Sequence, residues 1–243
     1  MEYTEVKPCR ELQSFIHAFW ELKGAENDGQ WERIFPDGCP GLVMNLGERC
    51  KTDNGLVTME FGKTYVVGAM TSFKDSFIDH NTHLLGVCLK PATFSNFYKY
   101  APQSELKDNT IEFDRSYSFN TDRIIKERSN YLNQFFSQRI IDKKNQLHSA
   151  LEDIQHSNGQ LNIFELAKRN HMTLRQLERN FKMQIGITPK EYSKIIRFQK
   201  ALSLINSASN RTLSEIAYEC GFYDHAHLSN EIKEHTGLTP SEL

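Results

Sequence analysis

The C-terminal part of the sequence contains an internal repeat. The segment GITPKEY at residues 186–192 is followed 51 positions later by GLTPSEL at residues 237–243. The residues before these segments also match, so that 165–189 aligns with 215–240 once a single residue is inserted. Two copies are too few for a solenoid, which needs at least about three repeats to bury a continuous core. The repeat therefore predicts two related structural units within one helical region.

Helix start signals define each unit. A capping box places Ser, Thr, Asn or Asp before the first helical residue and Glu or Gln three positions later, so that both side chains bind backbone N–H groups. Each unit also has an alanine, Ala167 or Ala217, where a second helix has to cross closely. A helix, a tight turn and a second helix of this kind predict a helix-turn-helix. The five candidate boxes are Asn162–Glu165, Thr173–Gln176, Thr188–Glu191, Thr212–Glu215 and Thr239–Glu242.

The second helix of each unit, at residues 173–185 and 224–236, is predicted to protrude. The predicted inward stripes are Leu174, Leu177, Phe181 and Ile185 in the first helix and Leu228 and Ile232 in the second. The opposite face of the first helix carries Arg and Gln side chains, which can make paired hydrogen bonds to guanine and adenine in a major groove. The outward residues predicted to contact DNA are Thr173, Arg175, Gln176, Glu178, Arg179, Lys182, His225, Ala226, Ser229, Asn230 and Lys233.

A continuous helix from about Pro189 to Ile205 is predicted between the two units. At ~1.5 Å per residue it spans roughly 25 Å, which is of the order needed to hold two recognition helices about 34 Å apart, one turn of duplex DNA. The charge distribution favours the same interpretation. Although the net charge of the chain is −2, ten basic residues and two acidic ones lie between Lys168 and Arg211. From Thr212 onward the sign reverses, with one lysine and six acidic residues.

Up to about residue 90 the sequence has a different character. Short segments rich in β-branched and aromatic residues, such as WERIF, GLVMNL and TYVVGAM, alternate with the turn sequences PDG and DNG. After Asn120 the apolar spacing is helical. The predicted fold class is therefore α+β. It comprises a mostly-β, barrel-like domain at residues 1–119, a helical linker that could mediate dimerisation at 120–141, and an all-α domain with two helix-turn-helix units at 142–243.

Two long segments carry a specific family resemblance: LAKRNHMTLRQLERNFKMQIGITPKEY and LSEIAYECGFYDHAHLSNEIKEHTGLTP. With them, residues 142–243 resemble the DNA-binding domain of AraC/XylS-type transcription regulators. The resemblance implies base and phosphate contacts from the outward residues above, and RNA polymerase as a partner. The chain departs from the family in its second recognition helix, where Asn230 stands for the usual arginine and His227 and Leu228 for an aromatic pair. We therefore expect the second unit to contribute less DNA affinity than the first.

The N-terminal segments FWELKG, ERIFPDGCPGLVMNLGE and VVGAM, followed by LLGVCLKPATF, carry a second resemblance. They are similar to the sensor-like, distantly cupin-like domain that precedes the DNA-binding domain in some AraC-type proteins. The mouth of a β-barrel can hold a small molecule. The candidates for lining such an effector site are Trp20, Trp31, Phe35 and Asn45, although aromatic residues on strands are also typical of a core.

No catalytic residue, cofactor or metal site is expected. His80 and His83 are three positions apart, which on a strand places them on opposite faces. The five cysteines are odd in number and contain no CxxC pair, so neither a disulfide framework nor a cysteine zinc site is predicted. We expect mostly buried thiols. The same spacing weighs against a fusion enzyme in which a zinc-activated cysteine accepts an alkyl group.

Three hypotheses remain open. The leading one is a one-component, cytoplasmic transcription regulator that binds double-stranded DNA and responds to an unknown effector or partner at its N-terminal domain. Homodimerisation is implied by the family resemblance only. The alternatives are a protein-interaction module that has lost DNA binding and, less favoured, the alkyl-transfer fusion. No signal peptide and no run of some 18 apolar residues is present, so we expect no membrane partner.

Overall fold

The computed structural model describes residues 1–141, 145–207 and 211–243. Its strands are β1 (Glu2–Val6), β2 (Ile16–Lys23), β3 (Gly29–Ile34), β4 (Gly41–Asn45), β5 (Cys50–Thr52), β6 (Val57–Met59), β7 (Thr64–Val67), β8 (Lys74–Asp79), β9 (His83–Leu89) and β10 (Thr110–Glu112). Its α-helices are α1 (Thr121–Glu127), α2 (Ser129–Ser137), α3 (His148–His156), α4 (Ile163–Arg169), α5 (Leu174–Gln184), α6 (Pro189–Asn206), α7 (Leu213–Glu219) and α8 (His225–Thr236). Short 3₁₀ turns are η1 (Arg10–Leu12), η2 (Asp53–Gly55), η3 (Phe94–Asn96) and η4 (Gln103–Glu105).

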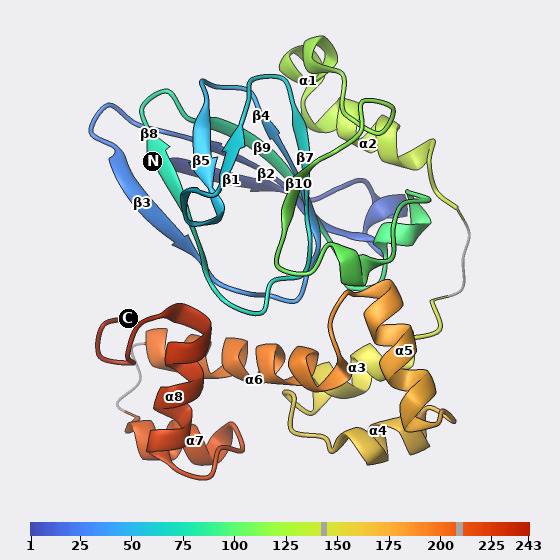
Figure 1. Cartoon of the computed structure of the whole chain (residues 1–243), viewed down its shortest axis with the longest axis vertical. Helices are drawn as coiled ribbons and strands as arrows, with labels where there is room; N and C mark the ends of the chain where they lie inside the picture. Colours follow the sequence, from blue (N-terminus) through green and yellow to red (C-terminus); the bar gives the residue numbers. More distant parts are fainter. Residues whose placement is uncertain (142–144, 208–210) are drawn as a thin grey trace.

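The chain is arranged in two layers, with the strands above and helices α3 to α8 below (Figure 1). The α+β class predicted from the sequence is therefore confirmed. We refer to the strands as the β domain and to α3–α8 as the helical domain. The boundary predicted at residue 142 lies outside the described residues. Within the described ranges, none of the helices is both long and apolar enough to cross a membrane.

The β domain is built from antiparallel sheets rather than a closed barrel. The main sheet has six strands in the order β1-β2-β9-β4-β7-β10, and β3–β8 and β5–β6 form two smaller sheets. The barrel-like prediction differs from this arrangement because β1 and β10 remain edge strands of the main sheet. Every residue of β1 is exposed, and β1 pairs with β2 alone among the described strands, so its outer edge is not hydrogen-bonded to another strand.

Helices α1 and α2 pack beside the sheet (Figure 1). The side chain of Asn120 caps α1 by accepting a hydrogen bond from the N–H of Arg123 at 2.9 Å. The apolar face of α2 is buried in the same core cluster as the strands, and Phe136 stacks on Phe19 of β2 with ring centroids 6.3 Å apart. The helices of the predicted linker thus contribute to the core of the β domain.

Helix α6 is continuous from Pro189 to Asn206, as predicted. Thr188 and Glu191 form its capping box and Pro189 occupies the first turn, where its missing N–H costs nothing. Of the other predicted boxes, those of Thr173 and Thr212 are complete. In the Thr239–Glu242 box, the carboxylate of Glu242 accepts from the N–H and the hydroxyl of Thr239, but the N–H of Glu242 donates to the backbone carbonyl of Thr239 rather than to its side chain, so these residues form a turn.

The β domain rests along the length of α6. Near its start, Lys107 Nζ lies 2.7 Å from Glu191 Oε1. Farther along, Gln199 Nε2 donates to the carbonyl of Pro36 at 2.5 Å. The ring of Phe35 meets that of Phe198 edge-on, with centroids 6.3 Å apart. One helix therefore connects the two helix-turn-helix units and also carries the contact with the β domain.

Candidate nucleic-acid interface

The first helix-turn-helix unit consists of α4 and α5. The side chain of Asn162 caps α4 by accepting a backbone hydrogen bond at 2.8 Å. Ala167 is buried in the core cluster that α4 shares with α5, as its small side chain predicts. His171 reverses the chain in the turn, with a left-handed φ of 52°. Helix α5 then begins at a capping box in which Thr173 and Gln176 bind each other's backbone N–H groups.

Helix α5 turns an apolar stripe inward. Leu177, Phe181 and Ile185 are fully buried, as predicted. The predicted stripe also includes Leu174, but this side chain is 42% exposed. Leu174 is the first residue of α5 and lies outside the core cluster that holds the other three residues. The first turn of α5 therefore extends beyond the core.

The outward face of α5 is exposed and basic. The exposed residues of the predicted set are Thr173, Arg175, Gln176, Glu178, Arg179 and Lys182. Gln176 is engaged within the helix, because its Oε1 accepts hydrogen bonds from the N–H of Thr173 at 2.8 Å and from its hydroxyl at 3.0 Å. Among the ion pairs of the described residues, none involves Arg175, Arg179 or Lys182. These three cations are available to a partner.

The second unit, formed by α7 and α8, repeats this construction. Thr212 opens α7 with a capping box, Ala217 is buried, and Gly221 makes the turn with a φ of 71°. The side chain of Asp224 then caps α8 by accepting from the N–H of His227 at 2.8 Å. The start of the second recognition helix therefore agrees with the predicted range 224–236.

Helix α8 buries more of its surface than predicted. Leu228 and Ile232 are fully buried, as expected, but Glu231 and His235 are also only 4% and 3% exposed. The sequence analysis did not anticipate these two buried polar residues. They recur four positions apart on one side of α8, and this side faces α6.

Glu231 is the electrostatic centre of the contact between α8 and α6. Its carboxylate lies 3.5 Å from Lys194 Nζ, 3.7 Å from Arg197 Nη2 and 3.9 Å from His235 Nε2. Burial alone would raise the pKa of Glu231, but His235 and the two cations outweigh it, so that the pKa is lowered. Glu231 is therefore ionised at neutral pH, where it attracts the cations of α6.

The outward face of α8 carries fewer charges than that of α5. His225, Ala226, Asn230 and Lys233 are exposed. Ser229 is half-buried, and its hydroxyl donates to the carbonyl of His225 at 2.8 Å. Lys233 is the one lysine or arginine among the predicted contacts of α8, whereas α5 has three.

Half of the basic block identified in the sequence is engaged in ion pairs within the protein. The engaged residues are Arg169, Lys194, Arg197, Lys200 and Arg211. Lys200 and Arg211 both pair with Glu219 of α7. The positive charge left outside such pairs is therefore concentrated on and near α5 rather than spread over the helical domain.

The two recognition helices lie at opposite ends of α6, with their C-terminal ends toward the β domain and their N-terminal ends away from it (Figure 1). At the end of α8, Arg33 Nη1 donates to the carbonyl of Thr236 at 2.9 Å, and His235 Nδ1 lies 2.8 Å from the carbonyl of Thr71. At the end of α5, Gly186 packs on the carbonyl of Gln103 in η4. Both helices thus leave their first turns, the part that reads bases in this motif, clear of the β domain.

A cavity of about 180 Å³ lies inside the β domain, lined by residues from all three sheets. Of the four predicted effector-lining residues, Trp20 and Phe35 line it, whereas Trp31 and Asn45 do not. Trp31 is 48% exposed on β3. Asn45 is fully buried and donates two hydrogen bonds to backbone carbonyls. Binding of an effector by any of the four stays a prediction.

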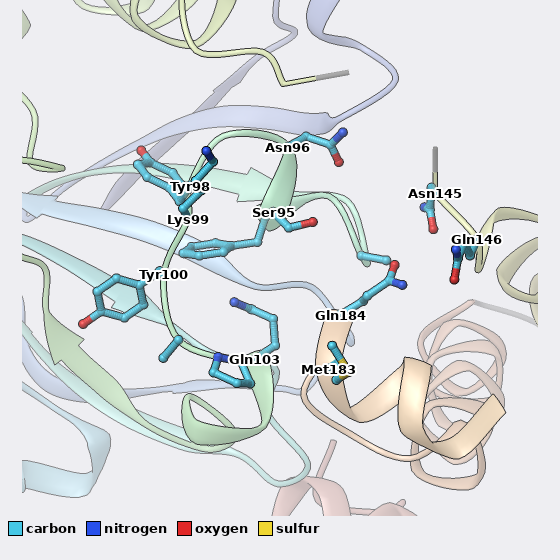
Figure 2. Close-up of a pocket in the computed structure, with 14 residues that line it drawn as sticks. Ser95, Asn96, Tyr98, Lys99, Tyr100, Gln103, Asn145, Gln146, Met183 and Gln184 are labelled. Atoms are coloured by element: carbon cyan, nitrogen blue, oxygen red, sulfur yellow. The ribbon is translucent and has the colours of Figure 1, made fainter. Parts of the chain in front are cut away.

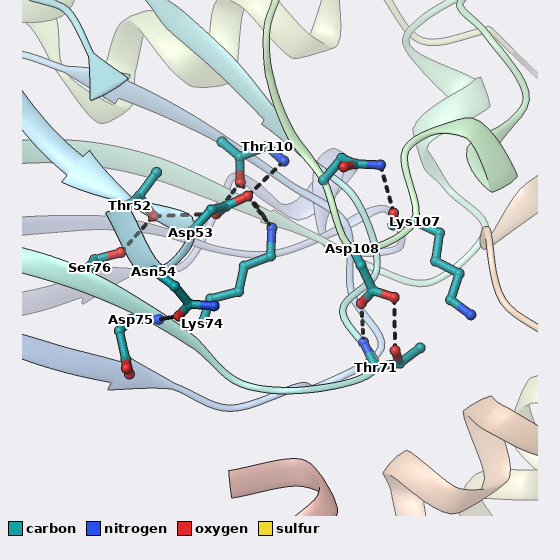
Figure 3. Close-up of polar contacts among 11 residues, drawn as sticks. Thr52, Asp53, Asn54, Thr71, Lys74, Asp75, Ser76, Lys107, Asp108 and Thr110 are labelled. Atoms are coloured by element: carbon teal, nitrogen blue, oxygen red, sulfur yellow. Dashed lines mark hydrogen bonds and ion pairs between the residues drawn. The ribbon is translucent and has the colours of Figure 1, made fainter. Parts of the chain in front are cut away.

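A buried ion pair borders this cavity (Figure 3). Lys74 Nζ lies 2.6 Å from Asp53 Oδ2, and both side chains are almost fully buried. Thr110 donates to the same carboxylate through its N–H at 3.1 Å and its hydroxyl at 2.8 Å. Fixed charges and hydroxyl groups therefore meet an apolar space, a combination that can orient a small ligand.

A larger cavity of about 660 Å³ lies between the β domain and the end of α5 (Figure 2). Phe94, Ser95, Asn96, Tyr98, Lys99 and Tyr100 line one side of it, and Met183 and Gln184 line the other. Gln103 also lines this cavity. The carbonyl of Gln103 packs so closely on Gly186 that a Cβ added to Gly186 would lie only 2.6 Å from it. A molecule in this cavity would touch both domains.

The cysteines are less uniformly buried than predicted. Cys50 and Cys220 are buried, Cys39 and Cys88 are half-buried, and Cys9 is exposed. Cys39 and Cys88 border cavities, and Cys9 lies on the surface just before η1. The burial of each thiol therefore depends on where its cysteine lies in the folded protein, and the spacing of the cysteines in the sequence does not predict this.

Two family models match the chain in succession. Residues 4–112 match a family described as a domain of unknown function (DUF6597), and residues 166–243 match a family described as a helix-turn-helix domain. The C-terminal part is therefore a double helix-turn-helix domain of the AraC/XylS type, as the resemblance implies.

Two curated relatives of this domain are transcription activators. The HTH-type transcriptional activator RhaS of Escherichia coli is 33% identical over 99 residues, which are 41% of this chain and 34% of RhaS. RhaS of Klebsiella pneumoniae gives the same identity and the same coverage. The chain thus spans about a third of the length of these relatives.

ToxT of Vibrio cholerae has the same fold over almost the whole chain. An apo variant of ToxT gives a TM-score of 0.54 at 14% identity, covering 92% of this chain and 96% of ToxT. ToxT bound to an unsaturated fatty acid gives a TM-score of 0.52, also at 14% identity, with 92% of each chain covered. The two proteins share a fold in which a β domain precedes a helical domain.

Proposed function

We propose that the protein is a sequence-specific, DNA-binding transcription regulator whose two recognition helices enter successive major grooves. The observation that carries this proposal is the free, exposed basic face of α5. Arg175, Arg179 and Lys182 are exposed on α5, and the first turn of this helix is clear of the β domain (Figure 1). Because α6 has 18 residues, it spans roughly 27 Å at ~1.5 Å per residue, close to one turn of duplex.

The proposed contacts differ in kind along α5. Arg175 and Arg179 have the side chain that pairs with guanine, and Lys182 can neutralise a phosphate. Thr173 lies at the N-terminus of α5, where backbone N–H groups attract a phosphate. Gln176 keeps only its amide N–H₂ free, because its oxygen completes the capping box. Glu178 would discriminate against phosphate and favour a cytosine amino group.

The proposed contacts of α8 are His225, Ala226, Ser229, Asn230 and Lys233. Asn230 can recognise adenine, and Ala226 can contact the methyl group of thymine. Because this face contains a single lysine and no arginine, we propose that the second unit adds specificity but less affinity than the first.

Residues 1–119 act, in this proposal, as the effector domain, with 120–141 as the linker and 142–243 as the DNA-binding domain. The effector is a small molecule bound in the cavity bordered by Lys74 and Asp53. Phe35 lines this cavity and also contacts Phe198 of α6. A ligand that moved Phe35 would therefore shift the population of helical-domain arrangements. Fatty-acid binding by ToxT is a precedent for a ligand in a protein of this fold.

The remaining partners follow from the same proposal. Activation of transcription, as in RhaS, would require contact with RNA polymerase, and its DNA target places the protein in the cytoplasm. Homodimerisation is proposed through surfaces of the β domain or of α1 and α2 that remain outside their shared core.

The test is selection of bound genomic fragments followed by titration of the recovered DNA. Neutralised phosphates release counterions, so the logarithm of the binding constant should fall with the logarithm of salt concentration by about 0.9 per phosphate contact. The double variant Arg175→Ala/Arg179→Ala should lower both affinity and selectivity, whereas Lys51→Ala, a change of an exposed cation on β5, should not. Binding that is weak, unselective and unchanged by the double variant would refute the proposal.

A further inference from the structure

Three side chains that can bind metals converge where the β domain meets α6. Asp37 and Cys39 lie in the loop between β3 and β4, and Cys88 lies on β9. The pairing of β4 with β9 places Gly41 opposite Cys88, which brings the nearby Cys39 into range. The carboxylate and the two sulfur atoms all lie within 4.8 Å of one another. The sequence spacing conceals this cluster because strand pairing creates it.

The loop is held in the conformation that forms the cluster. The carboxylate of Asp37 accepts a hydrogen bond from the N–H of Cys39 at 2.8 Å, which fixes the two side chains relative to each other. Between them, Gly38 has a left-handed φ of 74° and packs on the ring of Tyr192 in α6. The cluster is therefore organised by the backbone before any ligand arrives.

The cluster also has a route of access. Asp37, Cys39 and Cys88 line both the internal cavity and a second cavity, of about 380 Å³, between the two domains. The second cavity is also lined by His17 of β2 and by Tyr192 and other residues of α6 and α3. An ion could enter from this side, and the imidazole of His17 lines the same cavity.

The donor set selects a thiophilic metal ion. Zinc binds sulfur at about 2.3 Å and carboxylate oxygen at about 2.0–2.2 Å, so that tetrahedral coordination holds two sulfurs about 3.8 Å apart. The three ligand atoms already lie within 4.8 Å of one another, so they are within about 1 Å of the sulfur spacing that zinc requires. Thiolates favour zinc over magnesium or calcium, which prefer oxygen ligands.

We propose that Asp37, Cys39 and Cys88 form a zinc-binding site at the domain interface, with water or His17 as the fourth ligand. Three protein ligands leave one coordination position open, unlike the four protein ligands of a closed structural zinc site. The bound ion would fix the loop that rests on Tyr192, and thereby the contact between the β domain and α6. Zinc binding itself does not depend on the proposed regulatory function.

The experiment is a cobalt titration of the full-length protein after chelation and under a non-thiol reductant. Cobalt bound to two thiolates in a tetrahedral site should give thiolate charge-transfer absorption and visible d–d bands that saturate at one ion per chain. Zinc should displace it. Failure of the wild-type protein to develop these bands would overturn the proposal without recourse to any variant.

Variants locate the site. Cys39→Ser and Cys88→Ser should each weaken binding by at least about 100-fold and remove the two-thiolate spectrum, and Asp37→Asn should weaken it about 10- to 100-fold. Cys9→Ser changes an exposed thiol outside the cluster and should leave the titration unchanged. Circular dichroism checks that each variant is folded. Equal binding by Cys39→Ser, Cys88→Ser and the wild type would show that the metal binds elsewhere, and would overturn the assignment. The assignment would also be overturned if Cys39 and Cys88 formed a disulfide and the reduced protein bound no metal.

Discussion

A Cβ atom added to Gly38 would lie 2.7 Å from Cε2 of Tyr192, so the backbone of the β3–β4 loop rests directly on a side chain of α6. Tyr192 is fully buried beneath it. At this point of their interface, the two domains are in contact at van der Waals distance through one glycine and one aromatic ring.

Replacing Gly38 by alanine should destabilise the folded protein by roughly 1–3 kcal/mol, because the new methyl group collides with Tyr192 and the left-handed φ disfavours any side chain. Urea unfolding followed by circular dichroism measures the effect. Gly29→Ala is the matched control, since a Cβ there meets nothing within 4 Å. Equal midpoints for the two variants would contradict the close contact.

Replacing Arg179 by alanine should reduce affinity for the selected DNA by roughly 10- to 100-fold, the range expected for a base or phosphate contact worth about 1–3 kcal/mol. Asn230→Ala should cost less, because α8 presents a less basic face. Fluorescence anisotropy with the same DNA fragment at fixed salt compares the two variants. An equal or larger loss for Asn230→Ala would count against the proposed asymmetry between the units.

Breaking the buried Lys74–Asp53 pair should be costly. Lys74→Met leaves the carboxylate of Asp53 buried without its cation and should lower the free energy of unfolding by about 3–5 kcal/mol. Adding Asp53→Asn removes the orphaned charge while keeping an acceptor for Thr110, so the double variant should recover part of the loss. Chemical denaturation of the single and double variants tests this. A double variant that is less stable than Lys74→Met would contradict the electrostatic explanation.

Glu231 should make stability depend on acid pH. Its pKa is lowered in the folded state, so the stability it provides is present above the unfolded pKa of about 4.5 and is lost as the pH falls through the folded value. The difference in unfolding free energy between wild type and Glu231→Gln should therefore shrink from pH 7 to pH 3. Urea titrations across this range provide the measurement. Glu26→Gln, at an exposed position, should show no comparable trend.

The helical domain could be predicted closely from the sequence because its signals are local. Thr173, Thr188 and Thr212 cap the helices that the capping pattern predicts, and each pattern needs only four consecutive residues. The protruding helices followed from apolar spacing in the same way. Leu174 is the exception. The apolar spacing predicts that it is buried, but its exposure depends on where the first turn of α5 lies relative to α4, and the spacing does not predict this.

For the β domain, the sequence predicted the mostly-β character but not the arrangement of the strands. Strand β8 begins with the charged residues Lys74 and Asp75, and Lys74 is buried because Asp53 pairs with it from η2. Strand register also decides that Cys39 meets Cys88, and no short pattern in the chain records this register. Glu231 and His235 show the same effect on α8, since Glu231 is buried beside Lys194 and Arg197 of α6 and His235 packs on Phe198 of α6.

The unbroken course of α6 from Pro189 to Asn206 has an evolutionary consequence. Inserting or deleting one residue would rotate α8 about 100° around the axis of α6 relative to α5, and shift it by about 1.5 Å. Such a change C-terminal to Arg197 would also separate Glu231 from Lys194 and Arg197. We therefore expect single-residue insertions and deletions in this helix to be rare among related proteins. The spacing between the two DNA segments that the recognition helices contact should then be the same in these relatives.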